Sequence, residues 1–255
     1  MVRRGSSRIV NKTMLPFGDA NSLIEWKLAQ LVKVIDPARI YLSSEDDEFL
    51  ALADRFGVSR HKRAMRLARD HVAPFRDVIT GIVRDIPHAH IAWCTVVCPL
   101  MSPQEYLDAF RAYHDQVICG DHDSLVGVNL LKEYFWADGR SLNYRATRDH
   151  TISQELPDWF KVTNSVYMCA KREILAREYF LADKPVMAQL SKLAGVDIGA
   201  DFDKSLPRAG LIRGVHGVVQ AWEDDRPAGV DEMSRIGRSG LDLDDADLAA
   251  GIGTD

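Results

Sequence analysis

Helical and strand-like segments alternate at the start of the chain, and this alternation most constrains the fold. Apolar residues recur at helical spacing over about residues 23–35 and predict a helix, which a β-prone run at 39–43 follows. The acidic cluster 45–48 then opens a second helix that ends at Phe56, with Gly57 as its stop. We interpret these acids as complementing the helix dipole rather than as a metal site. Such alternation is typical of a parallel sheet flanked by helices, so we expect an α/β fold.

The pattern continues through the middle of the chain. The apolar run 91–97 lies between Pro87 and Pro99 and predicts a strand buried on both faces. The sequence Ser-Pro-Gln-Glu at 102–105 combines an N-cap, a proline at the first helical position and an acid in the first turn, and predicts a helix to about His114. The remaining elements that we expect are a helix at 75–85, strands at 124–128 and 162–170, a helix at 172–180, and a polar, aromatic excursion at 134–157.

Composition excludes several classes of protein. The chain of 255 residues is 46% hydrophobic and 27% charged, as is ordinary for a globular domain. Its net charge of −5 argues against a general nucleic-acid binder. No apolar run approaches the about 18 residues of a membrane span, and no signal peptide precedes the first element. The four cysteines show no C-x-x-C spacing and are interpreted as reduced thiols. We therefore expect a cytoplasmic protein that binds neither nucleic acid nor membrane.

Basic and small residues are interleaved at the head of the chain. Arg3, Arg8 and Lys12 surround the run Gly-Ser-Ser at 5–7. Small residues let backbone N–H groups approach an anion, and arginine and lysine add charge. The segment runs through Pro-Phe-Gly at 16–18 into the first helix, whose N-terminus also favours anions. The arrangement suits a nucleotide triphosphate, although no Walker loop is present. The alternative is a frayed tail.

Four blocks of sequence, in order, carry a resemblance to known proteins. The blocks are R-R-G-S-S-R-I-V-N-K-T with P-F-G (3–18), L-S-S-E-D through F-G (42–57), C-T-V-V-C-P-L-M (94–101), and N-S-V-Y (164–167) with D-I-G-A-D-F-D (197–203). In this order and spacing they resemble the N-acylneuraminate cytidylyltransferase family, the enzymes that make CMP-sialic acid and related CMP-activated sugar acids.

The resemblance implies a Rossmann-like nucleotidyltransferase domain over residues 1–203, with a mostly parallel sheet flanked by helices. Residues 132–160 resemble the family's dimerisation arm, which implies a homodimer. The family's first strand, central to its sheet, has no counterpart here: it either lies upstream of Met1 or is lacking. Beyond residue 203 the chain is irregular, Gly-rich and acidic, and we expect it to be mostly disordered.

The implied reaction transfers CMP from CTP to the anomeric hydroxyl of a sialic-acid-like sugar acid and releases pyrophosphate, with Mg²⁺ or Mn²⁺ as cofactor. The sugar acid itself, whether sialic, pseudaminic, legionaminic or deoxyoctulosonic, stays open. The residues that match the family's positions are Arg3 and Lys12 as catalytic phosphate contacts, Ser6, Arg8 and Asp70 for the nucleotide, Thr95 and Asn164 for the substrate, and Asp197, with Asp201 or Asp203, for the metal.

Three departures keep other readings open. Gly199 stands where a second metal-site aspartate is expected, Met101 replaces a frequent arginine, and Thr95 replaces a glutamine that commonly contacts substrate. A degenerate nucleotide-binding protein without turnover, or a truncated gene product, are therefore the alternatives. The pair His88 and His90 looks like a metal motif, but we interpret it as a solvated loop because no third ligand has suitable spacing.

Overall fold

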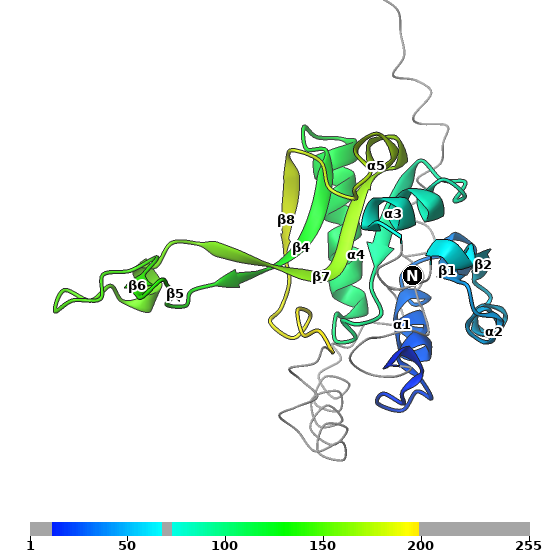
Figure 1. The fold of residues 1–255 in the computed structure, drawn as a ribbon, viewed down its shortest axis with the longest axis horizontal. Helices are drawn as coiled ribbons and strands as arrows, with labels where there is room; N and C mark the ends of the chain where they lie inside the picture. Colours follow the sequence, from blue (N-terminus) through cyan, green and yellow to red (C-terminus); the bar gives the residue numbers. More distant parts are fainter. Residues whose placement is uncertain (1–11, 68–72, 199–255) are drawn as a thin grey trace, which may run out of the picture.

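The computed structural model describes residues 12–67 and 73–198. Within them two groups of strands lie among helices (Figure 1). A four-stranded sheet has the order β3-β7-β4-β8, in which β7 runs antiparallel to both neighbours and β4 runs parallel to β8. A second sheet pairs β1 and β2 in parallel. The strands of these two sheets are β1 (Tyr41–Ser44), β2 (Ser59–Lys62), β3 (His90–Cys94), β4 (Ser124–Leu131), β7 (Trp159–Ala170) and β8 (Pro185–Gln189).

The helices begin and end largely where the local sequence dictates. Ser102 and Glu105 form a reciprocal capping box at the start of α4, and Asp46 caps α2. Gly57 ends α2 in the left-handed conformation, with φ of 67°. The helices are α1 (Leu23–Leu31), α2 (Asp47–Phe56), α3 (Phe75–Val83), α4 (Pro103–Tyr113) and α5 (Lys171–Arg177), with short turns at Lys12–Met14, Pro37–Arg39, Met65–Leu67 and Ser153–Glu155 and a π-helical turn at His114–Ile118.

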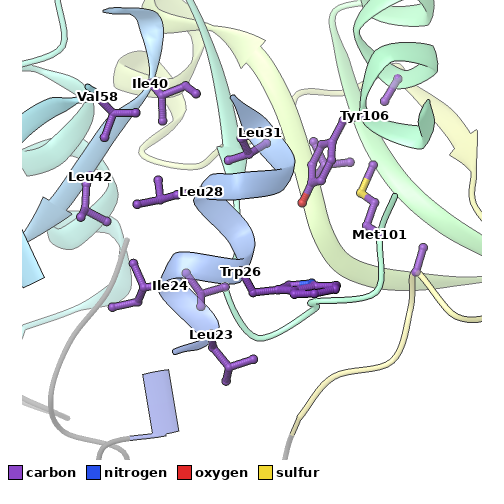
Figure 2. Close-up of a cluster of buried hydrophobic side chains, with 14 of the residues drawn as sticks. Leu23, Ile24, Trp26, Leu28, Leu31, Ile40, Leu42, Val58, Met101 and Tyr106 are labelled. Atoms are coloured by element: carbon purple, nitrogen blue, oxygen red, sulfur yellow. The ribbon is translucent and has the colours of Figure 1, made fainter. Parts of the chain in front are cut away.

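Helix α1 joins the two sheets into one core. Its apolar side chains pack toward Leu42 of β1 and the preceding Ile40 on one side and toward Met101 and Tyr106 on the other (Figure 2). Its polar residues Glu25, Lys27 and Gln30 are buried as well, so the helix is covered nearly all round. The prediction of a helix here is confirmed, but regular α-helix stops at Leu31 rather than at residue 35.

Strand β7 shows the layering of the four-stranded sheet. Val166 and Met168 lie in the core beside α1 and α4, whereas Tyr167 and Cys169 lie in a second cluster. That second cluster contains Ile79 from α3, together with Ile174 from α5 and Phe180. Because alternate residues of a strand face opposite sides, the sheet is covered by helices on both faces. The predicted α/β fold is therefore confirmed.

An arm leaves the sheet between β4 and β7. It contains the small strands β5 (Trp136–Ala137) and β6 (Arg140–Ser141) and extends far from the body of the protein (Figure 1). Tyr134, Tyr144 and His150 pack together on it, with ring centroids 4.6–5.4 Å apart. Trp136 remains exposed. The polar, aromatic excursion predicted at 134–157 is therefore present.

The structure differs from the sequence predictions at three strands. The prediction that the run 91–97 is a strand buried on both faces is wrong, because β3 ends at Cys94 and its side chains are half-buried or, at Ala92, exposed. Among the described residues β3 pairs only with β7, so it lies at the end of its sheet. Strands β2 and β8 were not predicted, because each has only five or fewer residues without strict alternation.

Several predictions lie outside the described residues. They concern the missing first strand, the phosphate-binding head of the chain and the tail beyond residue 203. Within the described part, β1 pairs only with β2 and β3 pairs only with β7, so one edge of each of these strands carries no partner strand from that part of the chain.

We predict that Gly57→Ala lowers the free energy of unfolding by about 1 kcal/mol, whereas Gly57→Asn lowers it less. Gly57 has a positive φ, and a Cβ placed there meets no atom within 4 Å, so the cost arises from the backbone alone. Urea unfolding of both variants measures the difference. Equal losses would contradict the account, because asparagine adopts this conformation more readily than alanine.

Candidate functional site

The first half of the candidate site joins the beginning and the end of the described chain. Lys12 donates a hydrogen bond from Nζ to the carbonyl oxygen of Ile198, and the same Nζ lies 3.9 Å from Oδ1 of Asp197. The backbone N–H of Ile198 donates to the carbonyl of Val97 over 2.9 Å. The side chain of Asp197 is 43% exposed and that of Lys12 is 14% exposed. A cation and a carboxylate therefore meet beside the loop that follows β3.

The second half lies on the same loop. Thr95 donates from Oγ1 to the carbonyl oxygen of Asn164 over 2.6 Å, and its N–H donates to the carbonyl of Ser165 over 3.2 Å. The two predicted substrate residues are thus neighbours. Since the Thr95 hydroxyl donates its hydrogen bond to the backbone carbonyl of Asn164, this side chain holds the segment that carries Asn164.

Asn164 lies in a large bulge of β7. Residues 163–166 stand opposite Gly127 alone, because Val162 pairs with Val128 and Tyr167 pairs with Val126. Bulges re-aim side chains next to functional sites. In this bulge Asn164 adopts the left-handed conformation, with φ of 57°, and its side chain is exposed.

Buried hydroxyls hold the bulge in place. Thr163 donates to the carbonyl of Gly127 over 3.0 Å and shares a 2.5 Å hydrogen bond with the hydroxyl of Ser165. A side chain at Gly127 would approach both hydroxyls to about 3 Å and Leu190 more closely still. The hydroxyl of Tyr167 donates to Oδ1 of Asn164, which orients the amide and leaves its nitrogen as the donor.

One short loop therefore carries both halves of the site. Thr95 contacts Asn164, Val97 contacts Ile198 next to Asp197, and the thiol of Cys98 donates to the carbonyl of Thr163 over 3.2 Å. The structure brings Lys12, Thr95, Asn164 and Asp197 to the end of the sheet that lies beyond the carboxyl terminus of β3. Open α/β sheets bind ligands at that end of their strands. The other predicted site residues, Arg3, Ser6, Arg8, Asp70, Asp201 and Asp203, lie outside the described residues.

A buried ion pair at the carboxyl ends of β1 and β2 was missed from the sequence. Arg63 follows β2, Glu45 follows β1, and the two side chains form an ion pair. The N–H of Arg63 also donates to the carbonyl of Ser44 over 2.9 Å. The interpretation of the acidic cluster is right for Asp46, which caps α2, but Glu45 faces Arg63 instead. Only the position of each residue just after a strand signals the pair.

A Ser–His–Asp chain occurs in the fold but is not suited to catalysis. Nδ1 of His61 lies 2.8 Å from the hydroxyl of Ser43, and Nε2 lies 3.2 Å from Oδ2 of Asp85. In serine hydrolases Nε2 faces the serine, so this order is reversed. Ser43 is also only 3% exposed, and no substrate can reach it. These three hydrogen-bonded side chains instead connect β1 and β2 to the segment after α3.

In the described residues, the predicted histidine pair and two buried cysteines have structural surroundings. His88 and His90 each contact a tyrosine hydroxyl, at 3.3 and 2.8 Å. No group of three potential metal ligands occurs in ranges 12–67 and 73–198. All four cysteines are free, as predicted, and burial raises the pKa of the Cys98 thiol and raises that of Cys169 to about 11, which disfavours the nucleophilic thiolate. None of the helices described could span a bilayer.

No family model matches the sequence, and neither does any curated protein. Solved structures do resemble the fold. A CMP:2-keto-3-deoxy-manno-octonic acid synthetase solved in complex with CTP matches with a TM-score of 0.49 and 13% identity, over 69% of this chain and 75% of its own. A cytidylyltransferase from Leptospira borgpetersenii matches with a TM-score of 0.44 and 17% identity, over 69% of this chain and 59% of its own.

The third structure matches more of the chain. It is the 4-diphosphocytidyl-2C-methyl-D-erythritol synthase of Anaerococcus prevotii, with a TM-score of 0.51 and 12% identity over 81% of this chain and 88% of its own. At this identity the likeness concerns architecture alone. The chain therefore has the α/β fold seen in the Anaerococcus synthase.

Proposed function

We propose that the protein is a cytidylyltransferase that transfers CMP from CTP to the anomeric hydroxyl of a sialic-acid-like sugar acid. The observation that carries the proposal is the convergence of Lys12, Asp197, Thr95 and Asn164, which come from three of the four sequence blocks, on the loop after β3. The solved structure that matches with a TM-score of 0.51 is named as a 4-diphosphocytidyl-2C-methyl-D-erythritol synthase, which is in keeping with a reaction that transfers a cytidylyl group.

The reaction needs positioning and charge neutralisation more than covalent help. The hydroxyl oxygen of the sugar acid forms a bond to the α-phosphorus of CTP, the bond from that phosphorus to the bridging oxygen breaks, and pyrophosphate carries away the electron pair. The hydroxyl proton passes to solvent. In our proposal Lys12, with Arg3, Arg8 and Ser6, binds the phosphate oxygens, and Asp70 lies on the nucleotide side.

Asn164 and Thr95 form the sugar side of the proposed site. The exposed amide nitrogen of Asn164 is a donor for the carboxylate or a hydroxyl of the sugar acid, and Tyr167 fixes the amide in that orientation. Thr95 sets the backbone at Asn164. The residues do not distinguish sialic, pseudaminic, legionaminic and deoxyoctulosonic acids.

The proposed reaction also uses a divalent cation beside Asp197. Mg²⁺ is commonly held by one or two carboxylates together with substrate phosphates and water, and Asp197 presents a partly exposed carboxylate next to Lys12, to which we assign the phosphates. We propose Asp197, with Asp201 or Asp203, as the ligands of Mg²⁺ or Mn²⁺. When bound, the ion would neutralise phosphate charge and polarise the α-phosphate.

We propose a role for the arm in assembly. We propose that the arm around residues 132–160 pairs two copies of the chain, since it extends from the body with Trp136, Leu142 and Ile152 exposed.

We propose a cytoplasmic location, because four free cysteines suit a reducing compartment. We further propose that residues 1–203 form the catalytic domain.

A nucleotide-binding protein without turnover is the second candidate. It is favoured by Thr95, whose hydroxyl is bonded to the backbone of Asn164 where the family has a glutamine for substrate. Isothermal calorimetry with CTP and Mg²⁺ separates the candidates when combined with a turnover assay. Binding without pyrophosphate release supports the second candidate, and no binding contradicts both.

The function is tested by pyrophosphate release from CTP and Mg²⁺ with a panel of nonulosonic acids. We expect release with at least one acid, and a loss of roughly 100-fold in kcat/KM in Lys12→Met, because one phosphate-stabilising group is removed. Lys33→Met, at an exposed lysine after α1, is the matched control and keeps full activity. No release with any acid would overturn the proposal, as would equal activity of Lys12→Met and the control.

Asn164 allows its side chain and its backbone to be tested apart. Glycine adopts the positive φ of Asn164 freely, so Asn164→Gly removes only the amide, whereas Asn164→Ala also adds a backbone cost of about 1 kcal/mol. We predict that both variants raise KM for the sugar acid about tenfold and leave KM for CTP unchanged. Both variants lose the hydrogen bond from Tyr167, so Asn164→Ala should be about 1 kcal/mol less stable in urea than Asn164→Gly. A KM change confined to CTP would contradict the assignment of Asn164 to the sugar side.

A further inference from the structure

Helix α1 contains a lysine that is buried beneath the candidate site. Lys27 is only 3% exposed. Its Nζ donates to the carbonyl oxygen of Cys98 and to the hydroxyl of Tyr106, each over 2.8 Å, and lies 5.0 Å from the centre of the Tyr106 ring. A buried ammonium is costly unless it is hydrogen-bonded, and here its partners are a loop carbonyl and a phenol.

Two neighbours on α1 bind the next carbonyl of the same loop. Nε1 of Trp26 donates to the carbonyl of Pro99 over 2.9 Å, and Nε2 of Gln30 donates to the same oxygen over 3.0 Å. Three side chains of one helix thus hold two consecutive carbonyls, those of Cys98 and Pro99. Of these three donors only Lys27 carries a charge.

The held carbonyls belong to the loop that carries both halves of the site. Thr95 and Val97 contact Asn164 and Ile198, as described above, and Cys98 itself contacts Thr163. A shift of the Cys98–Pro99 backbone would therefore reach Asp197 through Ile198 and Asn164 through Thr95.

The groups around Lys27 compensate the positive charge of its ammonium only weakly. The titratable groups that face it are the thiols of Cys94 and Cys98, the phenol of Tyr106 and the carboxylate of Glu105. Burial raises the pKa of both thiols and of the phenol, so these three are neutral near pH 7. Glu105 is the anion among them, and it binds the N–H groups of Ser102 and Ser191.

We propose that Lys27 is a positioning residue of the candidate site, whose ammonium holds the loop 95–99 through the Cys98 carbonyl and so sets Thr95 and the Ile198 backbone. Burial lowers the pKa of Lys27 to about 8, so its charge is lost as the pH rises just above neutral. The loop is then held by weaker, uncharged hydrogen bonds.

The effect on overall stability has the opposite sign. The unfolded chain keeps the lysine proton up to its ordinary pKa of 10.5, whereas the folded chain releases it near 8. Between these values the unfolded state binds more protons, so the contribution of Lys27 to the free energy of unfolding rises with pH. A positioning role therefore predicts local loosening of the loop while the molecule as a whole gains stability from this residue.

Hydrogen exchange on the full chain tests the inference without requiring turnover. In Lys27→Met, peptides covering 94–101 and 191–198 should exchange about tenfold faster than in wild type, with the 47–56 peptide of α2 unchanged. After correction for the intrinsic pH dependence, wild type should show the same acceleration between pH 7 and 9, and Lys27→Met should show none. Lys33→Met is the control and should match wild type.

Several outcomes would overturn the inference. They are unchanged exchange at 94–101 and 191–198 in Lys27→Met, equal acceleration in every peptide, and the same pH response in both proteins. If Lys27→Met does not fold, Tyr106→Phe provides the second variant: it removes one partner of the ammonium, and the loop of this variant should loosen at a lower pH than in wild type. If the pH midpoint of the loop's exchange in Tyr106→Phe equals that of wild type, the result counts against the inference.

The role in catalysis rests on the proposed function. If the protein releases pyrophosphate, kcat/KM of wild type should fall above about pH 8, and Lys27→Met should be about tenfold less active at pH 7 without that alkaline limb. Local exchange as predicted, with no turnover in wild type, would retain the positioning role and reject the proposed function. Normal turnover with an unaltered alkaline limb in Lys27→Met would reject the positioning role alone.

Discussion

Helix α1 donates side-chain hydrogen bonds to two consecutive backbone carbonyls, and these bonds fix the turn around which the candidate site is built. Trp26, Lys27 and Gln30 bind the Cys98–Pro99 turn, and the apolar residues of the same helix fill the space between the two sheets. An apolar helix alone would fill that space but would not fix the turn. The buried polar groups thus specify where the chain leaves β3.

This turn gives the candidate site its geometry. Segments from four distant parts of the sequence meet along a few residues of loop, and each is held by a backbone contact: Ile198 to Val97, Asn164 to Thr95, and Lys12 to Ile198. Side chains that sit on such a network are pre-organised, which favours a reaction that depends on positioning. The bulge opposite Gly127 adds the left-handed turn that exposes Asn164.

Much of the fold could be predicted from local signals. The capping residues of α4 and the glycine after α2 mark helix ends through interactions with adjacent residues, so the sequence contains their cause. The end of β3 at Cys94 and the strands β2 and β8 depend on pairing with distant segments, which periodicity does not report. In the site, Lys12, Thr95, Asn164 and Asp197 were predicted from resemblance. Lys27 was not, because a lysine on a helix is normally interpreted as a solvent-facing residue, and its burial arises only when the loop closes over it.

We propose that the nucleotide binds at the end of the sheet where this loop lies. Paramagnetic broadening in the ¹⁵N spectrum, as CTP is added together with Mn²⁺, measures this directly. We expect the amides of residues 95–98, 164–165 and 196–198 to broaden first, while those of α2 and of the arm strands β5 and β6 stay sharp. Broadening centred on α2, or none at all with CTP bound, would contradict it.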